Sequence, residues 1–204
     1  MLYLQTVSKK LHRFLTAIQE DTLFKELRLV GGTGLALQYG HRISVDLDFF
    51  GNLESESEEI AEWLSQLGQV KILKNSKNIK VFTVNDIKID FVNYKYPWID
   101  QPVEESELII ASDKDIAAMK VAAVTGRGSK KDFVDLYFLL QNYTMAQIID
   151  FYESKYSDAS LFLALKSLTF FEDADEQPMP KMLKVCHWQE VKAIILNEVK
   201  SFEG

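Results

Sequence analysis

The sequence predicts an α+β fold in which a mixed β-sheet flanked by helices is followed by an α-helical C-terminal part. Strand-like segments, either apolar or alternating, interleave with helical patterns up to residue 110, whereas from Ser112 onward the pattern is helical throughout. We therefore expect an α+β core at residues 1–110. A helical region at residues 111–204 would complete the functional site. The sequence shows no internal repeat and no low-complexity segment.

Composition narrows the class of protein. Of the 204 residues, 47% are hydrophobic and 26% are charged, as in ordinary globular proteins. We see no secretory signal and no apolar run of about 18 residues, so we expect a cytoplasmic protein that does not bind membranes. The single cysteine, Cys186, excludes an internal disulfide. A net charge of −7 argues against a broad electrostatic surface for nucleic acid.

Apolar spacing predicts the first elements. Residues 4–20 read as an amphipathic helix with a buried stripe of Leu11, Phe14, Leu15 and Ile18. A short apolar strand at residues 27–30 ends in a tight turn at Gly31 and Gly32.

The glycines lead into a short helix and a second strand. Thr33 is expected to cap a helix at residues 34–39, with Gly40 as its C-terminal stop. Residues 44–50 alternate as a strand does, so one set should share a polar face and the other should pack in the core. The polar face holds Asp46, Asp48 and Phe50, and the core face holds Val45, Leu47 and Phe49.

The next elements complete the predicted sheet. Ser55 or Ser57 can cap a helix that runs to Leu67. Three strands should follow at residues 70–73, 79–84 and 87–92, with a hairpin turn at Asn85-Asp86 and a loop at residues 94–102. Beyond them, Ser112 caps a helix that residues 126–128 break, and Phe133 lies in the next helix. The later segments are helices at residues 144–156 and 158–169, an acidic loop at 172–180 and a helix at 187–200.

Three carboxylates could form a metal site. Alternation places Asp90 on the polar face of strand 87–92, so it could meet Asp46 and Asp48 if the two strands are neighbours. Like charges at short range raise one another's pKa, so such a cluster favours a divalent cation. Mg²⁺ or Mn²⁺ prefers carboxylate oxygens and leaves positions for substrate phosphates.

Glycines and basic residues could bind those phosphates. A turn at Gly31 and Gly32 lets backbone N–H groups approach an anion at a helix N-terminus, and the Thr33 hydroxyl could add a contact. The most concentrated basic stretch contains Lys120, Arg127, Lys130 and Lys131.

These motifs resemble those of a known superfamily. Gly31-Gly32-Thr33 followed by residues 41–49, His-Arg-Ile-Ser-Val-Asp-Leu-Asp-Phe, resembles the first motif of the nucleotidyltransferase superfamily that includes DNA polymerase beta. The closest branch is the AbiEii/AbiGii-type toxins of toxin–antitoxin and abortive-infection systems. Residues 119–127 and 131–137 are similar to the later motifs of that branch.

The resemblance implies roles for particular residues. Asp46 and Asp48 would bind metal, and Asp90 would be a further ligand or the base. Lys120 would bind phosphate, and Asp132 or Asp135 matches an acidic residue that the branch requires. Arg42 and Ser44 belong to the expected phosphate-binding set, although Arg42 could instead brace Asp46 or Asp48 by a bidentate ion pair.

The implied function is metal-dependent transfer of a nucleoside monophosphate from an NTP to tRNA or protein, restrained by a cognate antitoxin. Two alternatives stay open: an antibiotic-type transferase that modifies a small molecule, and a noncatalytic module that binds a nucleotide or a partner. Simpler interpretations also exist for single residues. Asp46 and Asp48 could lie on a solvated strand face, Lys120 could snorkel to solvent, and Asp132 could complement a helix dipole.

Overall fold

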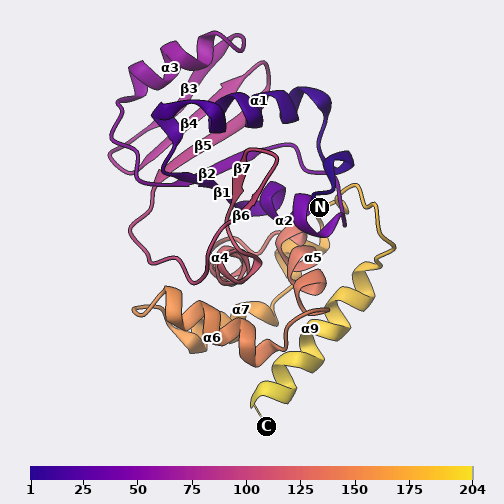
Figure 1. The fold of residues 1–204 in the computed structure, drawn as a ribbon. Helices are drawn as coiled ribbons and strands as arrows, with labels where there is room; N and C mark the ends of the chain where they lie inside the picture. Colours follow the sequence, from indigo (N-terminus) through magenta and orange to yellow (C-terminus); the bar gives the residue numbers. More distant parts are fainter. Residues whose placement is uncertain (204) are drawn as a thin grey trace.

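The computed structural model describes residues 1–203 and contains a seven-stranded mixed sheet with helices on both sides (Figure 1). The strand order is β3-β4-β5-β2-β1-β7-β6. The strands are β1 (Leu27–Leu29), β2 (Leu47–Gly51), β3 (Val70–Asn75), β4 (Ile79–Val84), β5 (Ile87–Asn93), β6 (Val103–Glu105) and β7 (Leu108–Ile110).

The helices follow the predicted order. They are α1 (Lys9–Glu20), α2 (Gly31–Tyr39), α3 (Ser57–Ser65), α4 (Asp113–Gly126), α5 (Lys130–Leu139), α6 (Met145–Lys155), α7 (Leu161–Leu168), α8 (Glu172–Asp175) and α9 (Trp188–Glu203), with short 3-10 turns η1 (Leu4–Thr6) and η2 (Thr22–Phe24). Figure 1 shows α1 and α3 on one side of the sheet and the helices from α4 onward grouped beyond α2.

An aromatic core fixes the face of the sheet that α1 and α3 cover. Phe49 and Phe91 stack at 5.6 Å between ring centroids, and Phe24 stacks on Phe91 at 5.1 Å. Phe14 and Phe82 are fully buried in the same core. Because strand side chains alternate, the residues between these aromatics project to the opposite face, which carries Asp48 and Asp90.

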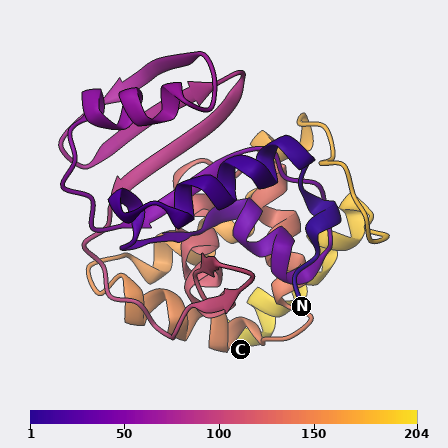
Figure 2. The same ribbon diagram turned by 45° about the horizontal axis from the view of Figure 1, so that its top comes forward.

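The predicted hairpin of two strands joined by Asn85-Asp86 is present. β4 and β5 pair antiparallel, and their turn residues Asn85 and Asp86 have φ values of 47° and 70°. Both lie in the left-handed region that a tight turn with the twist of the strands requires. Figure 2 shows the unit of β3, β4, β5 and α3 projecting from the rest of the molecule.

Two predictions about the first motif were wrong. The helix begins at Gly31, not at residue 34, and its N-cap is Val30, so Thr33 lies inside α2 and does not cap it. Strand β2 begins at Leu47, and Val45 is 64% exposed, so Val45 is not part of the core. Hydrogen bonds to the backbone of Ser44 and Asp46 hold this segment, which lies before the strand, so the alternation of a strand does not apply to it.

Other boundaries also moved. β6 and β7 were not predicted, because each has only three residues and exists through its pairing with a neighbour. Neither Ser55 nor Ser57 caps α3, whose N-cap is Glu56. The acidic loop after residue 171 contains the short helix α8.

The later helices pack mainly on one another and on α2. α4 contacts α2, α5, α6 and α7, and so lies at the centre of the helical half. Ser112 caps α4 as predicted, since its side chain accepts a hydrogen bond from the backbone N–H of Asp115. Among the described residues, no helix has the length and apolarity needed to cross a membrane.

Candidate active site

A cavity of about 470 Å³ lies between the polar face of the sheet and the helical half. Asp46, Asp48 and Asp90 line it from the sheet side, and Lys120 and Arg127 line it from the helical side. Residues far apart in the sequence thus share one cavity, as a catalytic site requires.

Asp48 and Asp90 are direct neighbours. Strands β2 and β5 run parallel, and their register places the Cα atoms of these two residues opposite each other. Burial, followed by the charge of Asp90, raises the pKa of Asp48 to about 6. The pair is therefore an electrostatically unfavourable arrangement that a bound cation would relieve.

The three carboxylates do not converge into a formed ligand cage. Asp90 Oδ2 pairs with Lys88, and Asp46 Oδ2 lies 3.7 Å from Lys131 Nζ. Within residues 1–203, no group of three or more His, Cys, Asp or Glu side chains has the arrangement of a metal site. Mutual repulsion explains why the carboxylates of Asp46 and Asp90 each turn toward a nearby lysine.

The donor set nevertheless suits a hard divalent cation. Asp90 Oδ1 is buried and has no hydrogen-bond partner within the described residues. An unsatisfied buried carboxylate oxygen is costly, and coordination to a cation would satisfy it. That Asp46, Asp48 and Asp90 bind a metal stays a prediction.

The two glycines allow α2 to start directly against these side chains. A Cβ at Gly31 would lie 2.4 Å from Asp48 Oδ2, and a Cβ at Gly32 would lie 2.3 Å from Arg42 Nη2. Gly31 also has φ of +65°, which favours glycine. Because Val30 offers no side-chain cap, the start of α2 faces the cavity with backbone groups.

Thr33 and Ser44 act on the segment that precedes β2. The Thr33 hydroxyl donates to the carbonyl of Asp46 and lies 2.8 Å from Ser44 Oγ. Thr33 is fully buried and does not line the cavity, whereas Ser44 does. Thr33 is therefore placed to fix the backbone at Asp46 and not to contact a phosphate.

Asp135 is the centre of a buried ion-pair network. It accepts a bidentate pair from Arg42 Nε and Nη2 at 2.7 and 2.8 Å, and forms an ion pair with Lys120 Nζ at 2.6 Å. His41 Nε2 lies 2.8 Å from Asp135 Oδ1. Although burial raises the pKa of Asp135, Arg42 and Lys120 together hold it well below its usual range.

Asp132 extends this network toward Arg127. Its carboxylate accepts hydrogen bonds from Lys120 and from Arg127 Nε, each at 2.9 Å, and also pairs with Ser129. Burial opposes ionisation of Asp132, but Lys120 and Arg127 lower its pKa. Neither Asp132 nor Asp135 lines the cavity, so both hold basic side chains at its wall and do not face substrate.

The predicted basic residues separate into two groups. Arg127 and Lys131 line the cavity with side chains 61% and 46% exposed. Lys130 does not line it: Lys130 Nζ bonds the carbonyl of Asp175 and lies 5.0 Å from the centroid of the Trp188 ring. Every predicted site residue therefore lines the cavity, except Thr33, Lys130, Asp132 and Asp135.

Two features of the site could not be predicted from the sequence. His41 is fully buried against Asp135. The segment that contains Arg42 also pairs with the chain near Met182, where Ile43 N donates to Lys181 O at 2.8 Å. No local pattern connects residues this far apart.

The fold is that of nucleotidyltransferases. The cavity agrees with this class, because it combines paired aspartates on parallel strands, a helix that starts with glycines, and basic side chains opposite them. Within this class, the chain belongs to the family described as nucleotidyl transferase AbiEii toxin, type IV toxin–antitoxin system, whose model matches residues 13–185.

Several known proteins are similar to this chain in sequence or in fold. An uncharacterized protein, aq_aa25, of Aquifex aeolicus (strain VF5) is 37% identical over 180 residues, which cover 85% of this chain and 86% of that protein. The nucleotidyltransferase toxin MenT4 (Rv2826c) of Mycobacterium tuberculosis H37Rv has a similar fold, with TM-score 0.59, 13% identity, and coverage of 94% of this chain and 82% of that chain. JHP933 from Helicobacter pylori gives TM-score 0.56 and 16% identity, covering 96% and 91%. The predicted fold class and family resemblance are confirmed.

Proposed function

We propose that this nucleotidyltransferase moves a nucleoside monophosphate from an NTP to an acceptor hydroxyl and releases pyrophosphate, in a reaction that requires Mg²⁺ or Mn²⁺. The observation that carries the proposal is the direct opposition of Asp48 and Asp90 in one cavity, with an unpartnered oxygen on Asp90. A cation held by Asp46, Asp48 and Asp90 would neutralise phosphate charge and polarise the phosphorus that is attacked.

The residues of the chain supply binding and orientation. Backbone N–H groups at Gly31 and Gly32 and the exposed side chains of Arg127 and Lys131 would bind the triphosphate. Lys120 and Arg42 are held by buried aspartates, so they present positive charge that needs little reorganisation during the reaction.

Asp90 is the carboxylate best placed to receive the proton of an acceptor hydroxyl. It lines the cavity, whereas Asp132 and Asp135 are saturated with basic partners and have lowered pKa values. A carboxylate with a lowered pKa is a weak base, and a buried one cannot reach the acceptor.

We further propose that the chain is the toxin of a toxin–antitoxin pair, with tRNA or protein as acceptor and a cognate antitoxin protein as partner. The family assignment supports this biology. The acidic composition of the chain offers no broad basic surface, so the acceptor would be recognised mainly near the cavity.

Transfer of label from each NTP tests the proposal. Total tRNA, cell protein and an aminoglycoside are offered separately with Mg²⁺, Mn²⁺ or a chelator. We expect labelled tRNA or protein that disappears with chelator and falls at least about a hundredfold in Asp48→Asn, because the charge that organises the site is lost. Asp86→Asn, an exposed aspartate in the hairpin turn, is the matched control and should retain activity.

Different outcomes separate the alternatives. Label on the aminoglycoside alone would replace the toxin proposal with a small-molecule transferase. Absence of transfer together with Mg²⁺-independent NTP binding that Asp48→Asn leaves unchanged would reject catalysis at this cavity.

A further inference from the structure

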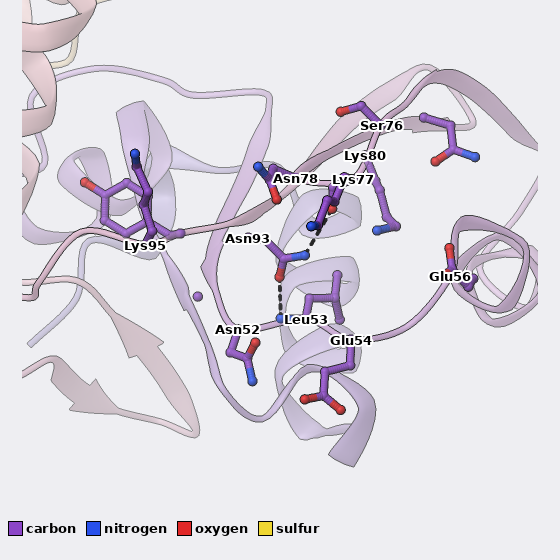
Figure 3. Close-up of a pocket in the computed structure, with 13 residues that line it drawn as sticks. Asn52, Leu53, Glu54, Glu56, Ser76, Lys77, Asn78, Lys80, Asn93 and Lys95 are labelled. Atoms are coloured by element: carbon purple, nitrogen blue, oxygen red, sulfur yellow. Dashed lines mark hydrogen bonds between the residues drawn. The ribbon is translucent and has the colours of Figure 1, made fainter.

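A second cavity, of about 660 Å³, lies at the ends of β2 and β5 (Figure 3). It is bounded by the segment that leads into α3, by the β3–β4 turn and by the residues that follow β5. Four asparagines and three lysines are among its lining residues. Such a polar lining suits a small charged ligand, and the volume is within the range of small-molecule sites.

This cavity is separate from the catalytic one. Lys80 is the register partner of Phe91, so its side chain projects to the face of the sheet that α1 and α3 cover. The adjacent residue, Ile79, projects to the opposite face and lines the catalytic cavity. The lining residues of the two cavities do not overlap, although both cavities adjoin the same strands.

Lys80 differs from the other buried lysines of the chain. Lys120 pairs with two aspartates, Lys155 pairs with Asp115, and Lys130 bonds a backbone carbonyl. Lys80 is only 6% exposed, yet no carboxylate or carbonyl of the described residues accepts a hydrogen bond from it. In Figure 3 its side chain extends from β4 into the space between Asn93 and Glu56.

The stem of Lys80 is therefore buried, while its ammonium group reaches the cavity without an acceptor from the described residues. The other buried lysines show that this fold supplies acceptors where a lysine has only a structural role. The absence of one for Lys80 within residues 1–203 points to an acceptor that comes from a ligand.

The surroundings of Lys80 favour an anion. Lys77 and Lys95 also line the cavity, and neither forms an ion pair with another described residue. The start of α3 lies at the same cavity, its N-cap Glu56 provides no side-chain hydrogen bond, and the Ser57 hydroxyl bonds Asn75 instead. Glu54 and Glu56 are exposed at the rim and not paired with Lys80, so they do not satisfy its charge.

We propose that this cavity binds a phosphorylated ligand, with Lys80 as the central contact to a phosphate group. Phosphate combines charge with several acceptor oxygens, which match three ammonium groups and the backbone N–H groups of a helix start. The phosphate belongs either to a free small molecule or to the backbone of a nucleic acid. The inference rests on none of the catalytic residues and is independent of the proposed nucleotidyl transfer.

Titration of inorganic phosphate into the full chain, without divalent cations and followed by NMR, tests the proposal. We expect saturable binding that Lys80→Met weakens about tenfold or more, because a charge-assisted contact is lost. Lys80→Arg should restore most of it. Lys71→Met, which replaces an exposed lysine of β3 outside the cavity, should bind phosphate as the wild type does.

Two results would overturn the proposal: no saturable binding by the wild type, or binding that Arg127→Met abolishes and Lys80→Met leaves intact. Thermal unfolding of each variant verifies that it is folded, and Met, which is apolar and of similar length, should be tolerated beside Phe91. A parallel titration with a short single-stranded oligoribonucleotide identifies the source. A matching loss of RNA affinity in Lys80→Met indicates a phosphodiester, and a loss confined to phosphate indicates a free phosphorylated molecule.

Discussion

Asp48 shows how the demands of a site oppose the stability of a fold at a single residue. Its carboxylate is close to Gly31 and opposite Asp90, and no described residue donates a hydrogen bond to it. Burial and the charge of Asp90 raise its pKa to about 6, so at neutral pH it is ionised at a cost to the folded state. Residues placed for function often carry such a cost.

We therefore expect Asp48→Asn to stabilise the protein at pH 7, by about 1–3 kcal/mol in the free energy of unfolding. The sign follows from the raised pKa: protonation of Asp48 stabilises the folded state at low pH, and this contribution is lost as pH rises through about 6. The gain in Asp48→Asn should be full above pH 7 and should vanish near pH 4.

Urea unfolding in the presence of a chelator, measured from pH 4 to pH 8, checks this expectation, with Asp86→Asn as the control. Added Mg²⁺ should stabilise the wild type more than Asp48→Asn. A variant that is less stable than the wild type at pH 7, or a difference that does not change with pH, would contradict the electrostatic explanation.

For single residues, the sequence predicted the direction of a side chain correctly where the residue lies in a regular strand, in which side chains alternate between faces. Regular strands place Asp48 and Asp90 on the polar face, and the structure has both there. Val45 was predicted to be buried but is exposed, because tertiary hydrogen bonds, including that of Thr33, hold the segment before β2. The buried partners of Asp135 could not be predicted, since a sequence pattern does not specify which charges from distant segments of the chain meet.

Among the secondary-structure elements, a buried ion pair ties α6 to α4 and to the aromatic loop after β5. Lys155 Nζ pairs with Asp115 and donates to Pro97 O at 2.7 Å, and both charged side chains are fully buried. Asp115 also accepts from Ile99 N at 2.9 Å. The Trp98 ring also contacts this ion pair, with its centroid 4.7 Å from Lys155 Nζ.

Replacement of Lys155 by Met should destabilise the fold by about 3–5 kcal/mol, because it leaves the Asp115 carboxylate buried without its counter-ion. Lys114→Met is a matched control from the same region. Lys114 pairs with Asp100 at the surface, with both side chains more than a third exposed, so its loss should lower the free energy of unfolding far less than the loss of Lys155.

Chemical unfolding of both variants measures the difference, and Lys155→Met combined with Asp115→Asn should recover part of the loss. Equal effects of the two lysine variants would show that burial adds nothing to the pair.

The periodicity of the sequence predicted which helices and strands exist, but it did not predict where they begin and end. The β4–β5 hairpin and α4 were predictable because alternation, turn residues and the Ser112 cap are local signals. β6 and β7 are strands only because they pair with each other and with β1, so the information that specifies them lies elsewhere in the chain.

On the scale of the whole molecule, the cavity proposed to be catalytic lies where the two halves meet. Arg42 comes from the first half, yet its guanidinium is held by Asp135 from α5. Gly34 in α2 packs so closely that a Cβ there would lie 3.2 Å from Ile110 and 3.3 Å from Ile116, on both sides of the predicted boundary. The buried core continues from the sheet through α2 into α4.

We therefore expect a fragment of residues 1–110 not to fold independently. It contains all seven strands, but removal of α4 and α5 would expose the apolar surface of α2 and leave His41 and Arg42 without Asp135. Burial of that apolar surface is a major part of the driving force for folding, and an unpaired buried charge adds a further cost.

The fragment should give a poorly dispersed ¹H–¹⁵N spectrum and no cooperative thermal transition, in contrast to the full chain. Addition of residues 111–204 as a separate fragment should restore part of the dispersion, because the missing partners of Arg42 return. A cooperatively folded 1–110 fragment would instead show that the sheet and its covering helices α1 and α3 hold enough core by themselves. The cavity would then be an interface between two independent domains.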